Sequence, residues 1–338
     1  GDHRDLHRLI RRQRQMCIRD RWWLVVPAES ERIWLPALVF FIEEKTELVF
    51  SRIIIVSLLS TLASLLFAIP YLLVFGPSEE INLVKESEYG STAAFINTFL
   101  FLAIAVIATI IMLYLIRRKM INILTYVMIL LISYLAGVLF MMFIPLTIAI
   151  AFLTFFPESL VTTLILENYE IIFLLTGIVF FILTILSMLS PKMLNLRNLI
   201  LFLTAVFIGI LLGTSSGFYT PIVLLAIFAM YDIYTVYRGP LGKLMNEIME
   251  ERTEEKSTKR PLIIGLGDIA FFSIPVAYSL AYFDLMWSII VMISIFIGFI
   301  ITSAIFIILA KKKKKVIMPG LPIPISFALI TILIRLFL

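Results

Sequence analysis

Long apolar stretches dominate this sequence and restrict the folds open to it. Nine stretches from residue 53 onward are long enough to cross a bilayer as a helix, which takes roughly 17–25 residues. They comprise residues 53–75, 93–116, 121–145, 170–189, 197–214, 218–237, 262–282, 286–310 and 322–338. Only 15% of the 338 residues are charged, which is too few to cover a water-facing surface. We therefore predict an all-α, multi-pass transmembrane fold with nine helices.

These stretches divide the chain into four parts. The parts are a basic and interfacial N-terminal segment (1–52), helices one to six (53–237), a charged cytosolic loop (238–261) and helices seven to nine (262–338). Residues 1–21 are rich in arginine but lack a helical apolar stripe, so they are either foreign to the natural protein or an amphipathic arm. Residues 33–42 are apolar but too short to cross a bilayer, and we expect them to lie at its interface.

The basic residues alternate between the two sides of the predicted membrane. One set of connections carries Arg117 to Lys119, Lys192 with Arg197, the Lys and Arg of 238–261, and Lys311 to Lys315. The opposite connections carry Lys85 alone, beside several glutamates. The residues after the third stretch stay apolar as far as Phe156. The connection before this region is basic and the connection after it is not, so the chain must cross the membrane an odd number of times between them. Because positive connections stay inside, we predict a cytosolic N-terminus and a C-terminus outside.

The sequence contains few reactive side chains apart from its acids. Cys17 is the single cysteine, which excludes an internal disulfide framework and a multi-thiolate metal site. The two histidines, His3 and His7, lie outside every apolar stretch, which excludes zinc proteases of the HExxH type and Ser–His chemistry within the membrane. The net charge of +5 comes from short blocks between apolar stretches and not from a nucleic-acid-binding surface. We expect no metal, no cofactor and no nucleic acid partner.

Two acids, Asp232 and Asp268, lie well inside apolar stretches. Holding an ionised carboxylate at the centre of a bilayer costs at least about 2.5–3.5 kcal/mol, and neither stretch offers a basic partner. Asp232 precedes Tyr237 by five residues, or about 8 Å of helix, and Asp268 follows Arg260 by eight, or about 12 Å. Both are counted from the same side of the membrane, so the two carboxylates reach similar depths. The alternative is an acid that reaches towards the interface.

Two neighbouring carboxylates without a cation between them cannot both ionise at neutral pH, so they share a proton. The ionised member then takes a proton from water while the protonated member polarises a carbonyl oxygen, as in aspartic proteases. This chemistry requires no histidine, thiol or metal. We therefore predict that Asp232 and Asp268 form a catalytic pair.

Small and polar residues flank both acids. Gly265, Leu266 and Gly267 precede Asp268 and leave one helix face without bulk, which favours either access of an extended peptide or simple helix packing. Tyr231 precedes Asp232 and either donates a hydrogen bond in the site or belongs to the interfacial aromatic belt. We assign all four residues to the support of the active site.

A proline-rich segment opens the last stretch at the same side of the membrane. It consists of Pro319, Gly320, Leu321 and Pro322, with Pro324 following. We expect this proline density to prevent a regular helix start and to leave backbone groups unpaired. An extended substrate is expected to pair with these groups by strand addition, so we assign Pro319 to Pro322 to substrate binding. The alternative is that they form only the first turn of a helix.

At these residues the sequence resembles the presenilin-type intramembrane aspartyl proteases. Tyr231-Asp232 resembles the YD motif of the family, and Gly265-Leu266-Gly267-Asp268 resembles its GxGD motif. Pro319-Gly320-Leu321 resembles its PAL motif, with Gly in place of the usual Ala. Arg238-Gly239-Pro240-Leu241 is similar to the KGPL that follows the presenilin YD span. The three motifs are in the family order and on the expected spans.

The resemblance implies an intramembrane aspartic endopeptidase that cleaves transmembrane helices of other proteins within the lipid bilayer. The predicted orientation is that of presenilins and not the reversed one of signal peptide peptidases. The chain lacks the long acidic loop of animal presenilins, so it resembles a compact archaeal homologue that works in a prokaryotic cell membrane without accessory subunits. The rival hypothesis is a proton- or cation-coupled secondary transporter that uses the two acids as its ion site.

Overall fold

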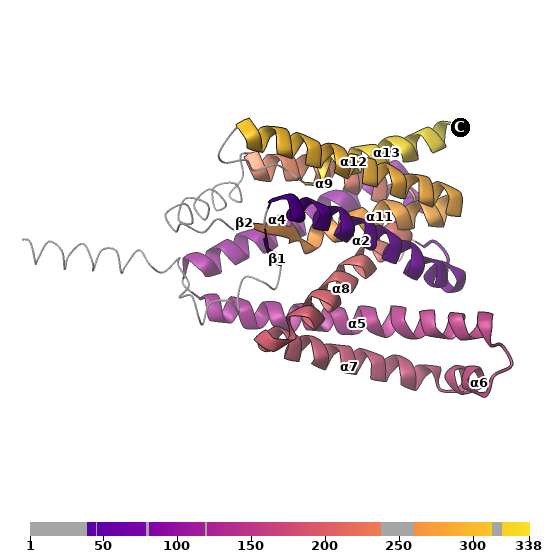
Figure 1. Cartoon of the computed structure of the whole chain (residues 1–338). Coiled ribbons are helices and arrows are strands. Elements are labelled where there is room, and N and C mark those ends of the chain that lie inside the picture. The colour runs from indigo at the N-terminus through magenta and orange to yellow at the C-terminus, as the bar shows by residue number, and fades with distance from the viewer. Residues whose placement is uncertain (1–38, 45, 79–80, 119, 238–259, 313–319) are drawn as a thin grey trace, which may run out of the picture. The chain divides into compact units, whose positions relative to one another are not determined.

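The fold is described from a computed structural model, shown in Figure 1. The structure describes residues 39–44, 46–78, 81–118, 120–237, 260–312 and 320–338. The expectations for residues 1–38 and for the charged loop after Tyr237 therefore fall on residues outside this description. So does Pro319 of the proline-rich segment.

Each of the nine predicted stretches contains one long α-helix. These helices are α2 (Thr46–Phe75), α4 (Ser91–Arg117), α5 (Ile121–Phe155), α7 (Tyr169–Leu189), α8 (Leu194–Thr214), α9 (Thr220–Tyr237), α11 (Leu266–Tyr282), α12 (Leu285–Lys312) and α13 (Pro322–Phe337). The short helices α3 (Glu86–Tyr89) and α6 (Leu160–Glu167) and the 3₁₀ turn η2 (Pro191–Met193) lie between them. Among the described residues, six helices (α2, α4, α5, α7, α8 and α12) are long and apolar enough to cross a membrane. The chain is thus a multi-pass membrane protein, while nine crossings stay a prediction.

Helix α5 extends ten residues beyond the predicted end of its stretch at residue 145, because Pro145 lies inside it without ending it. Pro145 lacks the N–H that would donate to the carbonyl of Met141, so the helix loses one backbone bond and continues. Transmembrane helices tolerate such a proline where other groups satisfy the freed carbonyl. The apolar character that continues to Phe156 therefore belongs to one long helix.

One two-stranded ribbon departs from the all-α expectation. Strand β1 (Val39–Glu44) pairs antiparallel with β2 (Arg260–Gly265), with Val39 opposite Gly265 and Glu44 opposite Arg260. We predicted a helix from residue 262, but α11 begins only at Leu266. The segment before it contains Pro261 and the β-branched pair Ile263 and Ile264, which favour a strand at an edge over a helix. Part of the segment predicted to be interfacial, residues 39–42, lies in β1.

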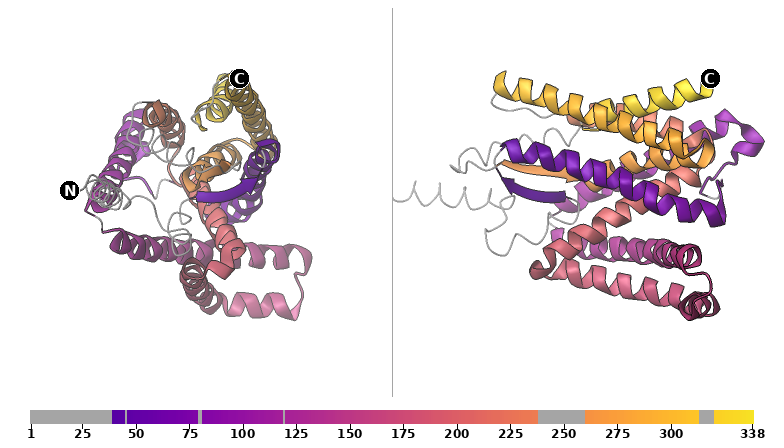
Figure 2. Two further views of the ribbon diagram at one scale, coloured as in Figure 1. Left: turned by 60° about the vertical axis from the view of Figure 1, so that its left-hand side comes forward. Right: turned by 45° about the vertical axis from the view of Figure 1, so that its right-hand side comes forward.

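Helix α8 lies at the centre of the described packing, in contact with α2, α5 and α11, and it runs obliquely between α5 and α11 (Figure 2). Phe207 of α8 stacks on Phe143 of α5 with ring centroids 4.5 Å apart. On its other side, Gly209 and Gly213 face the backbone of α11. A Cβ atom at Gly213 would lie 2.6 Å from the carbonyl oxygen of Ile274. The two glycines, spaced as G-x-x-x-G, therefore allow α8 and α11 to approach closely.

Replacing Gly213 by Ala is expected to lower the free energy of unfolding by about 1–3 kcal/mol, because the added methyl group forces α8 and α11 apart. Gly267→Ala is the matched control, since a Cβ at Gly267 meets nothing within 4 Å. Denaturant unfolding of the purified protein in detergent compares the two variants. Equal stability of Gly213→Ala and Gly267→Ala would contradict the close packing.

The connection between α2 and α4 holds the start of α9 in place. The amide of Ser78 donates to the carbonyl of Thr214 at 2.9 Å, and the amide of Gly217 donates to the carbonyl of Ser78 at 3.0 Å. The side chain of Glu86 is buried and accepts the amides of Tyr219 at 2.8 Å and Thr220 at 2.6 Å. It accepts the hydroxyl of Thr220 as well. The sequence placed Glu86 only among loop acids, whereas the structure makes it the cap of α9.

Candidate active site

Asp232 lies in the last turns of α9, and the proline-rich segment reaches it. The Asp232 side chain is half-buried, and its Oδ2 accepts the backbone N–H of Leu321 at 3.2 Å. The backbone of Gly320 also interacts with this carboxylate. Leu321 itself is buried at the start of α13, which contacts α9. The structure therefore brings Gly320 and Leu321 together with Asp232, although they are almost ninety residues apart in sequence.

Asp268 lies in the first turn of α11, directly after the β-ribbon, and is half-buried. A carboxylate at this place interacts favourably with the positive end of the helix dipole. Because β2 ends at Gly265, the chain changes from strand to helix just before Asp268. The acid thus lies where extended backbone meets helical backbone.

Aromatic contacts fix the register between α9 and α11. The ring of Phe218, before α9, lies 5.3 Å from the ring of Tyr282 at the end of α11. Further along, the ring of Phe228 lies 4.9 Å from that of Phe271. From the first ring contact to the second, the residue number rises along α9 and falls along α11, so the two helices pack antiparallel.

The same register predicts where the two acids lie relative to each other. Asp232 lies four residues beyond Phe228, or about 6 Å along α9, and Asp268 lies three residues before Phe271, or about 4.5 Å along α11. Residues three or four apart share a helix face. Because the rings of Phe228 and Phe271 are in contact, we expect Asp232 and Asp268 to face each other at nearly the same level.

The remaining candidate residues are arranged differently from the prediction. Gly265 ends strand β2 and lies outside the helix expected before Asp268, whereas Leu266 is the first residue of α11. Gly267 is exposed, and a Cβ atom there would meet no described atom within 4 Å. Tyr231 is half-buried, and its ring packs 6.2 Å from that of Phe228. The close helix packing belongs instead to Gly209 and Gly213, which their spacing could have revealed.

The expectation that prolines prevent a regular start of the last helix is wrong. Pro322 occupies the first helical position of α13, with Leu321 as the N-cap residue, and the amide of Ile325 donates to the carbonyl of Leu321 at 3.0 Å. Proline is favoured at this position because its missing N–H would have no partner in the helix. Gly320 precedes the cap, is exposed and has open space around it. Its backbone nevertheless remains beside Asp232.

Comparison with solved structures shows a likeness at the level of the fold. A solved structure, described as that of a presenilin family intramembrane aspartate protease, matches this chain with a TM-score of 0.50. The match covers 84% of this chain and 97% of the other, with 17% sequence identity. The chain shares the fold of a presenilin-family protease. No family model and no curated protein matches the sequence. At this identity the likeness shows the fold alone.

Proposed function

We propose that this protein is an intramembrane aspartyl protease, which hydrolyses peptide bonds within the transmembrane helices of other membrane proteins. The proposal is supported by the antiparallel ring contacts between α9 and α11, from which we expect Asp232 and Asp268 to face each other at one level, and by the presenilin-like fold. The transporter hypothesis is not favoured, because it predicts an ion site near the middle of the membrane between two repeated halves.

In this proposal Asp232 and Asp268 share one proton. The ionised carboxylate removes a proton from water, and the resulting hydroxide attacks the carbonyl carbon of the substrate. The protonated carboxyl group gives its proton to the carbonyl oxygen as the tetrahedral intermediate forms. The intermediate then collapses: the carboxyl group that took the proton from water passes it to the leaving nitrogen as the peptide C–N bond breaks, and the first carboxylate takes back a proton from the new carboxyl product. Which aspartate is the base is not assigned, since a shared proton belongs to the pair. The N–H of Leu321, 3.2 Å from Asp232, supports the ionised form of that side chain.

The surrounding residues are proposed to receive the substrate in extended form. A helix hydrogen-bonds its own carbonyls, so a substrate helix must unwind before attack. We assign Gly265, Leu266 and Gly267 to the approach, because the open space at Gly267 leaves room beside Asp268. Pro319, Gly320, Leu321 and Pro322 are assigned to substrate binding, and Tyr231 to the support of Asp232.

The proposed setting is a prokaryotic, archaeal-type cell membrane, with the basic connections and the N-terminus in the cytosol and the C-terminus outside. The partners are transmembrane-helix substrates and the bilayer. No accessory subunit, metal or cofactor enters the proposed mechanism.

Incubation with a tagged transmembrane peptide tests the function. We expect products whose masses add up to that of the substrate plus one water, and we expect a transition-state inhibitor of aspartyl proteases to suppress them. A protein that leaves several such peptides intact, yet carries a proton or cation flux in proteoliposomes, would support the transporter instead.

A further inference from the structure

Arg197, near the start of α8, is a buried cation whose Nε has no hydrogen-bond partner among the described residues. The side chain is only 3% exposed, and its Nε is fully enclosed without a hydrogen-bond acceptor. No carboxylate pairs with Arg197 within the residues that the structure describes. A guanidinium stays protonated in proteins, so this site keeps its positive charge. A buried charge of this kind is costly unless an anion or hydrogen-bond acceptor meets it.

The position of Arg197 favours an anion that comes from outside the chain. Helix α8 begins at Leu194, and its N-cap residue Met193 makes no hydrogen bond from its side chain to the helix. Helical side chains tilt towards the N-terminus, so Arg197 extends towards this uncapped end, where backbone N–H groups and the helix dipole also attract anions. Lys192 lies exposed just before the helix. The three features together gather positive charge and hydrogen-bond donors at one end of the helix.

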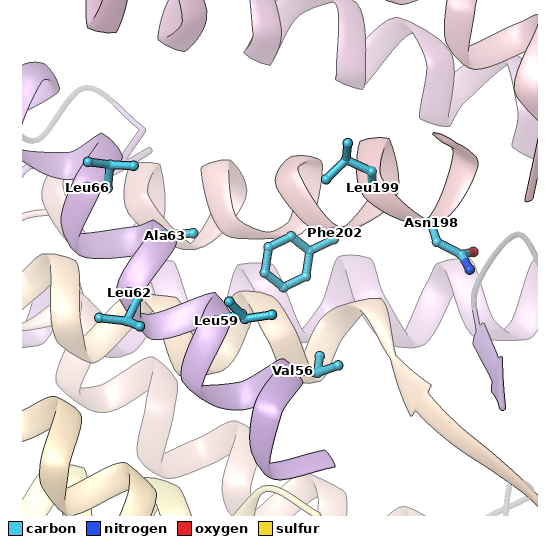
Figure 3. A pocket seen from close by; sticks show the side chains of 8 residues that line it. All are labelled: Val56, Leu59, Leu62, Ala63, Leu66, Asn198, Leu199 and Phe202. Atoms are coloured by element: carbon cyan, nitrogen blue, oxygen red, sulfur yellow. The ribbon is translucent and has the colours of Figure 1, made fainter. Parts of the chain in front are cut away.

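A groove on the outer surface lies between α2 and the first turns of α8. It has a volume of about 490 Å³, and Asn198, which follows Arg197, is the one polar residue among the eight that line it (Figure 3). Leu59, Leu66 and Leu199 of its lining are 51%, 62% and 54% exposed, so in a membrane protein this groove faces lipid. Apolar walls with a polar end match a lipid chain followed by its headgroup.

We propose that the start of α8 binds a phospholipid, with its phosphate held by Arg197 and the N-terminal amides of the helix, and with one acyl chain in the groove between α2 and α8. Arg197 and Asn198 point about 100° apart around the helix. The proposed position of the phosphate is therefore beyond the N-terminal end of α8, where it can be reached from the Arg197 face and from the Asn198 face of the helix. This site is independent of the proposed proteolysis.

Thermal unfolding of the delipidated full-length protein in detergent tests the proposal. Three additions are compared: phosphatidylglycerol, diacylglycerol with the same chains, and inorganic phosphate. We expect phosphatidylglycerol alone to raise the unfolding midpoint, by roughly 3–6 °C near saturation. In Arg197→Gln the apparent affinity falls by roughly tenfold or more. Without lipid this variant is at least as stable as the wild type, because an unpaired buried charge is gone.

Arg118→Gln is the matched control, since Arg118 is an exposed arginine at the turn between α4 and α5. It is expected to keep the full response to phosphatidylglycerol. Arg197→Lys, which keeps the charge, is expected to keep part of it and serves if Arg197→Gln does not fold. An equal shift with diacylglycerol or with inorganic phosphate alone would overturn the lipid assignment. So would an unchanged response to phosphatidylglycerol in both variants of Arg197.

Discussion

Replacing either Asp232 or Asp268 by Asn is expected to reduce the cleavage of a purified transmembrane substrate by about 10³-fold or more, while the protein stays folded. An asparagine neither accepts a proton from water nor donates one to the carbonyl oxygen, and general acid–base catalysis contributes about 10²–10⁴-fold for a single group. The shape of the side chain is preserved, so packing around α9 and α11 changes little. Initial rates of product formation, measured by mass spectrometry, give the comparison.

Asp284→Asn is the control for this pair of substitutions. Asp284 is exposed before α12 and accepts the amide of Trp287 at 2.8 Å, a bond that an asparagine oxygen also accepts. We expect this variant to cleave at the wild-type rate. Full activity in both Asp232→Asn and Asp268→Asn would remove the basis of the proposed mechanism.

Replacing Glu86 by Ala is expected to be the most destabilising of the single substitutions considered. The variant leaves the buried amide of Thr220 and the part-buried amide of Tyr219 without an acceptor. A buried amide without a partner costs about 1–3 kcal/mol, so we expect the free energy of unfolding to fall by at least about that amount. Glu86→Gln, which keeps one oxygen acceptor, is expected to lose less. Denaturant unfolding in detergent measures all three proteins.

Glu88 provides the matched control, because it is exposed in the same short helix, α3. Glu88→Ala is expected to change stability by less than about 0.5 kcal/mol. If Glu86→Ala were as stable as Glu88→Ala, the cap on α9 would contribute nothing to the free energy of unfolding.

The lengths of the apolar stretches predicted much of the helical framework, because a membrane-spanning helix depends mainly on its own sequence. The strand β2 could not be predicted in this way. Its partner β1 lies more than two hundred residues earlier, so the local run of apolar residues before Asp268 was interpreted as helix. The end of α5 was ambiguous in the sequence, because Pro145 interrupts a stretch whose apolar character continues to Phe156, and the helix passes through the proline.

The candidate site, too, could be predicted only in part from the sequence. Counting residues from the ends of the stretches predicted a common depth for Asp232 and Asp268, but the count for Asp268 assumed helical rise over residues 260–265, which form strand β2. The contact between Leu321 and Asp232 depends on how α13 packs against α9, which no local pattern specifies. The role of Glu86 was hidden for a similar reason, because its partners Tyr219 and Thr220 lie far along the chain.

Cross-linking tests the facing arrangement of the two aspartates most directly. In a Cys17→Ser background, which removes the single native cysteine, we introduce Asp232→Cys and Asp268→Cys and add a short dithiol cross-linker. We expect rapid cross-linking within one chain, whereas Asp232→Cys combined with Asp284→Cys, at the far end of α11, is expected to remain unlinked. A failure of Asp232→Cys and Asp268→Cys to link in the folded protein, or equal linking of both pairs, would contradict the shared-proton mechanism.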